Sequence, residues 1–215
     1  MRKSPFVAGL DVVQRSLTSY LRPLGFRKKG RSFNRPVEDG LVHVATLQMG
    51  QYPIGEYVIP GIRESHYGRF TVNLGVFLPG ARSIEHKRPA PAFLREYDCD
   101  IRERLGVLAH SEDTWWDLDH AVPKTAVEVV RLMDAFGIPF LERFENSAAV
   151  LDNIDSGGEL PFCNAGRSAL VGGLLSAHLG QADRAAGYFE KAALLAGTHR
   201  GFAEHVAEMR RACGI

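Results

Sequence analysis

Residues 69–78 read RFTVNLGVFL and form the clearest β-strand pattern in the chain. Apolar side chains occupy the even positions from Phe70 to Leu78, whereas Arg69, Thr71 and Asn73 occupy odd positions. Successive side chains of a strand point to opposite faces of its sheet. The pattern therefore predicts a sheet with one buried face and one polar face that is open to solvent.

The segments around this strand predict the fold class. Ser4-Pro5 and apolar residues at three-and-four spacing predict a helix that ends before Pro23. Further strands are expected at residues 31–37, 41–49, 101–108 and 114–118, and the segments 51–68 and 79–91 are expected to be irregular. Helices are expected at residues 123–136, 139–144, 148–154, 167–179, 183–196 and 201–212. This order is typical of an α+β fold with an antiparallel sheet of four to five strands and segregated helices.

Ser156-Gly157-Gly158 is the best candidate for a linker. It predicts an α+β domain over residues 1–155 and a helical extension over residues 160–215. In that extension, Gly173, Ala185, Phe189 and Ala192 fall on positions that resemble a tetratricopeptide repeat. One such pair cannot bury its own apolar faces, so we expect a docked helical hairpin that residues 201–212 cover on its open side.

Composition excludes several classes of protein. The chain has 215 residues, 45% of them hydrophobic and 24% charged, with a net charge of +1, which excludes a disordered or collagen-like chain. No apolar run approaches the roughly 20 residues of a membrane span, and Asp11 and Arg15 interrupt the signal-like start. Three cysteines without close spacing favour a reducing compartment, so we expect a cytoplasmic protein.

Charge is unevenly distributed along the chain. Residues 1–40 contain nine Lys or Arg and three acids, whereas residues 95–119 contain three Arg and eight acids. Arg27, Lys28 and Lys29 with Phe26 and Phe33 form a pattern that predicts phosphate contacts and base stacking. The alternative is a solvated hairpin edge, because lysine-rich edges block unwanted strand pairing.

Motifs for catalysis or metal binding are absent from the sequence. It has no nucleophile elbow, phosphate-binding loop or dinucleotide fingerprint, and its eight histidines lack metal-ligand spacing, so we expect no metal and no cofactor. Cys99 lies between Asp98 and Asp100, whose charges disfavour a thiolate. In Trp115-Trp116, a strand would bury one indole and direct the other to the polar side.

Several short motifs together resemble a bacterial family of domains of unknown function, number 4304, over about residues 5–145. The resemblance rests on residues 25–30 (GFRKKG), 33–35 (FNR), 70–76 (FTVNLGV), 98–99 (DC), 104–106 (RLG), 115–116 (WW) and 137–141 (GIPFL). The family implies no established activity, cofactor or catalytic residue.

Three functional hypotheses follow. The first is a non-enzymatic cytoplasmic module that binds or regulates a protein partner, for example by neutralising a toxin. Its candidate binding face comprises Arg31, Arg35, Arg69, Asn73, Arg102 and Trp116. The second is nucleic-acid binding through the basic hairpin at residues 27–35, with contacts from Arg27, Lys28 and Lys29. The third is a hydrolase-type enzyme that assembles Arg69, Asn73, Cys99, Asp100 and Arg102.

Overall fold

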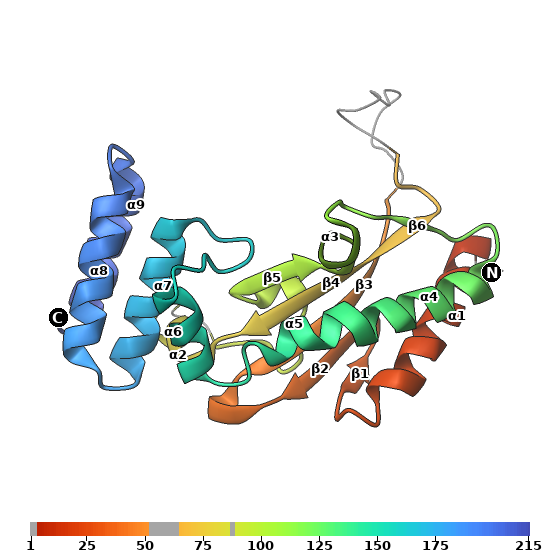
Figure 1. Ribbon diagram of the computed structural model, residues 1–215, viewed down its shortest axis with the longest axis horizontal. Coiled ribbons are helices and arrows are strands. Elements are labelled where there is room, and N and C mark those ends of the chain that lie inside the picture. The colour runs from red at the N-terminus through yellow and green to blue at the C-terminus, as the bar shows by residue number, and fades with distance from the viewer. Residues whose placement is uncertain (1–3, 52–64, 87–88) are drawn as a thin grey trace. The chain divides into compact units, whose positions relative to one another are not determined.

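A computed structural model describes residues 4–51, 65–86 and 89–215 and has an α+β fold, as predicted (Figure 1). Its antiparallel sheet has the strand order β1-β2-β3-β4-β5, and β6 pairs with β4. The strands are β1 (Arg27–Lys29), β2 (Ser32–Pro36), β3 (Val42–Met49), β4 (Arg69–Phe77), β5 (Ile101–Arg104) and β6 (Trp116–Asp117). The sequence did not predict β1 as a separate strand.

Nine α-helices lie in the part of the chain that the structure describes. They are α1 (Pro5–Leu21), α2 (Pro79–Glu85), α3 (Leu105–His110), α4 (Val122–Leu132), α5 (Ile138–Glu142), α6 (Ser147–Asp155), α7 (Ala165–His178), α8 (Ala182–Ala196) and α9 (Arg200–Ala212). Short 3₁₀ turns η1 (Glu38–Gly40) and η2 (Glu96–Asp98) and a π-helical turn η3 (Met133–Gly137) complete the elements. None of these helices is both long and apolar enough to cross a membrane.

Three local predictions were wrong. Pro79 opens helix α2 where an irregular segment was expected, because proline fits the first helical turn. Residues 105–108 form part of α3 and not the end of a strand. Gly137 does not end a helix, since η3 joins α4 to α5 without a break. The predicted irregular segment at residues 51–68 falls largely on residues 52–64, outside the described residues.

The chain folds into two compact units. Unit 1 comprises Met1–Arg35, His43–Gly75 and Glu103–Glu142, and unit 2 comprises Pro36–Val42, Val76–Arg102 and Arg143–Ile215. The predicted boundary near residues 156–158 concerns independent folding and stays a prediction.

In unit 1, helices α1 and α4 pack against each other. Leu10, Val13 and Leu17 form the buried stripe of α1. A Cβ atom on Gly9 would lie only 2.9 Å from the carbonyl oxygen of Leu118, so glycine permits this close approach. The spacing that predicted α1 therefore also identified its buried face.

The polar face of β4 exists, but it is not open to solvent, which corrects the prediction. Asn73 is only 5% exposed, and its Nδ2 donates to Oε1 of Gln48 at 2.7 Å. Thr71 is buried and donates to the carbonyl oxygen of Thr114 at 3.2 Å. Polar side chains that satisfy one another in this way tolerate burial. The alternation in sequence gave the two faces correctly but not the exposure of the polar one.

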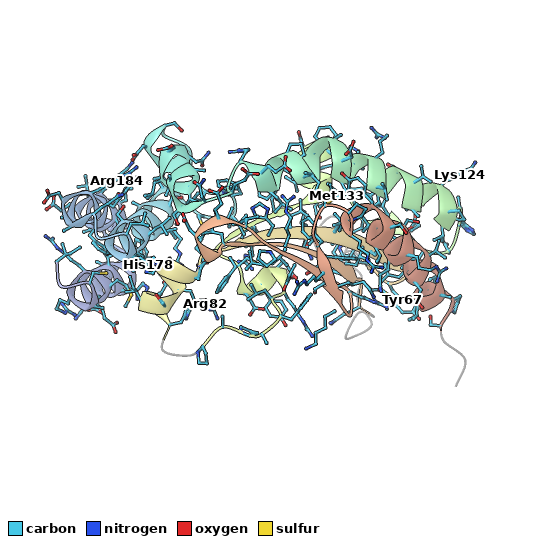
Figure 2. All side chains as sticks on the ribbon, turned by 90° about the horizontal axis from the view of Figure 1, so that it is seen from below. Tyr67, Arg82, Lys124, Met133, His178 and Arg184 are labelled. Atoms are coloured by element: carbon cyan, nitrogen blue, oxygen red, sulfur yellow. The ribbon has the colours of Figure 1, made fainter. Side chains whose placement is uncertain are left out.

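In unit 2, α7 and α8 form the expected helical hairpin. A Cβ atom on Gly173 would lie 3.0 Å from the ring of Phe189, so the small residue admits the large one. α2 also packs against α7, where a Cβ on Gly80 would lie 2.5 Å from the ring of His178, which Figure 2 labels. α9 contacts α7 and α8, as expected of a covering helix. The relation to tetratricopeptide repeats stays a prediction.

Candidate anionic-ligand groove

The site begins where α1 ends. The N–H of Phe26 donates to the carbonyl of Leu21 at 3.2 Å, and the N–H of Gly25 donates to that of Arg22 at 3.1 Å. These two bonds are those of a Schellman motif, in which the residue after the cap is left-handed. Gly25 has a φ of +88°, a conformation that glycine adopts without steric cost. The motif turns the chain sharply from α1 into β1.

A tight hairpin follows this turn. β1 pairs with β2 in the register Arg27↔Asn34, Lys28↔Phe33 and Lys29↔Ser32. Only Gly30 and Arg31 connect the strands, and Gly30 has a φ of +60°. Glycine at the first position of a two-residue loop fits the twist of a hairpin. β1 thereby becomes the terminal strand of the sheet, beside the last turn of α1 (Figure 1).

A groove with a volume of about 570 Å³ lies between these two elements. We call it the basic groove, and it is lined by Thr18, Arg22, Gly25, Phe26, Arg27, Lys28 and Phe33. Phe26 and Phe33 are 4% and 1% exposed and form its floor. The side chains of Arg22, Arg27 and Lys28 are exposed at its rim.

The charge of the basic groove has one sign. Three of its described lining residues carry a positive charge, and none of them carries a carboxylate. The sequence reinforces this, because seven Arg or Lys and no Asp or Glu lie between Asp11 and Glu38. A concave surface lined by one sign of charge concentrates ions of the opposite sign. The basic groove is therefore suited to a negatively charged ligand.

The candidate nucleic-acid residues meet this groove only in part. Arg27, Lys28 and Lys29 are exposed on β1, as the pattern predicts. Phe26 and Phe33 are buried, so their rings are not available to stack on bases, and that part of the expectation was wrong. They were drawn inward because they supply core area beside the sheet.

The candidate binding face predicted from sequence does not form one surface. Ser32 accepts a hydrogen bond from Thr46 at 3.1 Å, and Gln48, two residues further along β3, bonds to Asn73. These bonds place Asn73 and Ser32 on one face of the sheet. Arg35, three residues after Ser32 in the same strand, lies on the other face.

Arg35 lies among partners on that other face. Its Nη2 lies 3.0 Å from Nδ1 of His43 and 3.7 Å from Oε1 of Glu142. Its guanidinium also lies 5.0 Å from the centre of the Phe26 ring, directly beside the basic groove. Arg31, at the hairpin loop, is half-buried, and its carbonyl accepts from the N–H of Leu47. Arg35 thus supports the floor of the groove rather than an open sheet face.

The other members of the predicted face have local structural contacts. Arg69 donates to Asp117 at 2.9 Å, which neutralises its charge. Trp116 is 7% exposed and packs on Phe70 with ring centres 5.6 Å apart, so it is a core residue. Trp115 is the half-exposed indole, and it stacks on His66. The expectation that one indole of the pair is buried is confirmed.

Arg102, in unit 2, covers an exposed aromatic ring. Its guanidinium lies 4.4 Å from the ring centre of Phe162, which is 74% exposed. The N–H of Arg102 also donates to the carbonyl of Pro161 at 3.4 Å. These contacts fasten the loop before α7 to β5.

Two residues of the enzyme hypothesis, Cys99 and Asp100, have buried side chains in unit 2. Burial, and then the charges of Asp100, Asp98 and Glu96, raise the pKa of the Cys99 thiol well above its usual range. A thiol held in this state is a poor nucleophile. Asp100 is buried beneath the same segment, and its Oδ2 accepts from the N–H of Leu78 at 3.0 Å.

A buried charge cluster in unit 2 connects four distant segments of the chain. Arg167 of α7 donates through Nη1 and Nη2 to both carboxylate oxygens of Glu85, and His205 of α9 lies 2.9 Å from Glu85. Burial opposes ionisation of Glu85, but the bonds and charges of Arg167 and His205 lower its pKa to about 2. Burial raises the pKa of Asp100 to about 6, against the opposing effects of Leu78 and Arg167. Because Glu85 is already paired with Arg167 and His205, we interpret this cluster as structural.

The described residues contain no group of three or more His, Cys, Asp or Glu that could hold a metal ion. Sequence reasoning identified the rim residues of β1 but missed Thr18 and Arg22, the contribution of α1 to the basic groove. Their four-residue spacing places them on one helix face, and that was the available signal.

Comparison with known proteins gives one result. A family model described as Domain of unknown function (DUF4304) matches residues 17–143, which confirms the family expected from the sequence motifs. The match includes every residue of the basic groove. No curated protein and no solved structure matches the chain.

Proposed function

The chain belongs to the DUF4304 family, and on that premise we propose that it is a binding module that docks a negatively charged protein partner through the basic groove. One observation supports this function above the others. The groove combines three exposed cationic side chains with an apolar floor and has no carboxylate among its described lining residues.

The rim charges of the groove are not consumed by ion pairs among the described residues. The ion pairs of Arg35, Arg69 and Arg104 use acidic partners elsewhere in unit 1. Lys28 bonds instead to the carbonyl of Gly30, an uncharged acceptor, at 3.4 Å. Its positive charge therefore stays available to a ligand.

Retention on a heparin column tests this function with a generic polyanion. The variant with Arg27→Glu and Lys28→Glu changes the charge of the groove by four. We expect it to elute at clearly lower salt than the wild type, because contacts between exposed charges weaken as counter-ions screen them. Both substituted side chains are exposed, so the fold is expected to be unchanged by circular dichroism.

A charge-matched control distinguishes the groove from net charge. Lys124→Glu with Lys191→Glu also changes the charge by four, and both residues are exposed on helices outside the groove, as Figure 2 illustrates for Lys124. We expect this control to elute with the wild type. Equal shifts of the two variants, or no retention of the wild type, would refute docking at the basic groove.

A further inference from the structure

The backbone of β1 has hydrogen-bonding groups that point away from β2, at the edge of the sheet. In a two-residue hairpin, the pair next to the loop exchanges both ladder bonds and the following pair exchanges none. Lys29↔Ser32 is the first pair, so Lys28↔Phe33 is the non-bonded one. The N–H and C=O of Lys28 therefore point away from β2. Within the described residues, β2 is the only strand that pairs with β1.

The shape of the groove fits an extended chain. One wall is a β-strand and the other is a helix, with Thr18 and Arg22 one turn apart on it. A groove between an edge strand and a helix is a common place for an added peptide strand, whose main chain bonds to the edge and whose side chains enter pockets.

From these observations we propose that the partner enters the groove as an extended acidic peptide segment that carries an apolar side chain. The carboxylates face Arg22, Arg27 and Lys28, the apolar side chain lies toward Phe26 and Phe33, and the peptide main chain bonds to Lys28. This inference rests on the proposed function and specifies the chemistry of its partner.

The charge pattern alone also suits a nucleic acid, but the floor disfavours one. Single-stranded nucleic acids are held by stacking of bases on exposed aromatic rings. Both groove phenylalanines are almost fully buried. An apolar side chain of a peptide needs no exposed aromatic face to stack on and can contact the apolar lining of the groove.

Selection from a library of random twelve-residue peptides, displayed on phage and presented to the full-length protein, tests the inference. We expect selected peptides to be enriched in Asp or Glu with at least one large apolar residue. Arg27→Glu with Lys28→Glu should weaken the selected peptide at least tenfold, and Lys124→Glu with Lys191→Glu should leave it unchanged. A library that yields no sequence, or only neutral or basic ones, would overturn the inference.

Further measurements test whether the peptide main chain bonds to β1 and whether the partner is a peptide or a nucleic acid. Slower hydrogen exchange of the Lys28 amide in the complex, and loss of binding when the central peptide amides are N-methylated, are expected of strand addition. Unchanged exchange and tolerance of methylation would contradict it. A twenty-nucleotide single-stranded DNA that binds more tightly and displaces the peptide would overturn the peptide inference, whereas failure on heparin would overturn the docking function itself.

Discussion

Gly25 shows how one residue determines the geometry of the basic groove. Its positive φ lets the Schellman motif close at the end of α1, and this turn places Phe26 at the floor and Arg27 at the rim. Any side chain at this position meets the steric cost of a left-handed backbone. The groove therefore depends on a residue that carries no functional group.

Replacing Gly25 by alanine is expected to destabilise the protein by about 1–2 kcal/mol, the usual cost of a left-handed non-glycine residue. Urea denaturation monitored by circular dichroism measures this change. Gly187→Ala is the matched control, because Gly187 lies inside α8 with open space around its Cβ position. That control should gain up to about 1 kcal/mol from helix propensity. Equal effects of the two substitutions would show that the turn does not constrain Gly25.

At the scale of elements, sequence periodicity predicted most helices and strands correctly. The three-and-four spacing of apolar residues predicted α1, and the alternation of apolar and polar residues predicted β4. The short elements β1 and α3 were missed because three strand residues and six helical residues each contain less than two periods of their own pattern. Alternation also cannot report what covers a face, so the burial of Asn73 was not predictable.

The candidate site was predictable only where its residues are consecutive. Arg27, Lys28 and Lys29 form a visible run of charge, whereas Arg22 joins them only because the Gly25 turn folds α1 back beside β1. Candidate residues chosen by chemical type alone, such as Arg35 and Asn73, proved to lie on opposite faces. Pairing partners decide such placements, and they are distant in sequence.

The buried carboxylates of unit 2 predict how its stability depends on pH. The pKa of Asp100 is raised to about 6, so the folded state binds a proton there that the unfolded state has released. Stability from this group is present below about pH 4 and is lost as the pH rises through 6. Glu85 acts in the opposite direction, since its pKa is lowered to about 2 and its contribution is lost only in more acid solution. The interval from pH 4.5 to 7 therefore separates the effect of Asp100 from that of Glu85.

Asp100→Asn is expected to remove this loss and to raise the stability at pH 7 by roughly 2–3 kcal/mol, from a shift of about two pKa units. Urea denaturation at pH 4.5 and pH 7 gives the difference between variant and wild type. The asparagine Oδ1 keeps an acceptor for the N–H of Leu78, and Arg167 keeps Glu85. Asp152→Asn, an exposed control, should not change the pH profile. A profile of Asp100→Asn parallel to that of the wild type would contradict the assignment.

At the scale of the whole molecule, the net charge is only +1, but positive charge is locally in excess at the basic groove. The basic groove lies within residues 18–33, inside the part of the chain that the family model matches, whereas α7, α8 and α9 lie beyond it. The basic groove and the C-terminal helices thus occupy different parts of the sequence. Whether the extension folds separately is a question about the contacts of unit 2.

Those contacts predict that the extension is not dispensable. A chain of residues 1–155 lacks Arg167 and His205, which leaves the buried carboxylate of Glu85 without either partner. The removed helices also carry much of the buried apolar core of unit 2, and losing it takes away a large share of the stability of a domain. α2 would also lose α7, against which Gly80 packs. We expect this chain to melt without cooperativity, with poorly dispersed amide resonances.

A shorter truncation tests the same argument and removes fewer contacts. A chain of residues 1–198 loses α9 with its buried Val206 and Met209, but Arg167 still pairs with Glu85. It should unfold cooperatively at a temperature below that of the full chain, because it loses the apolar contacts of α9, the His205 bond and the ion pair of Arg210 with Glu190, but keeps the rest of unit 2. Cooperative melting of residues 1–155 close to the full-length transition would instead show that the linker at residues 156–158 separates independent domains. Of these two outcomes, loss of cooperativity is the expected one for residues 1–155, because that chain lacks both the Arg167 partner of Glu85 and the helix α7 against which α2 packs.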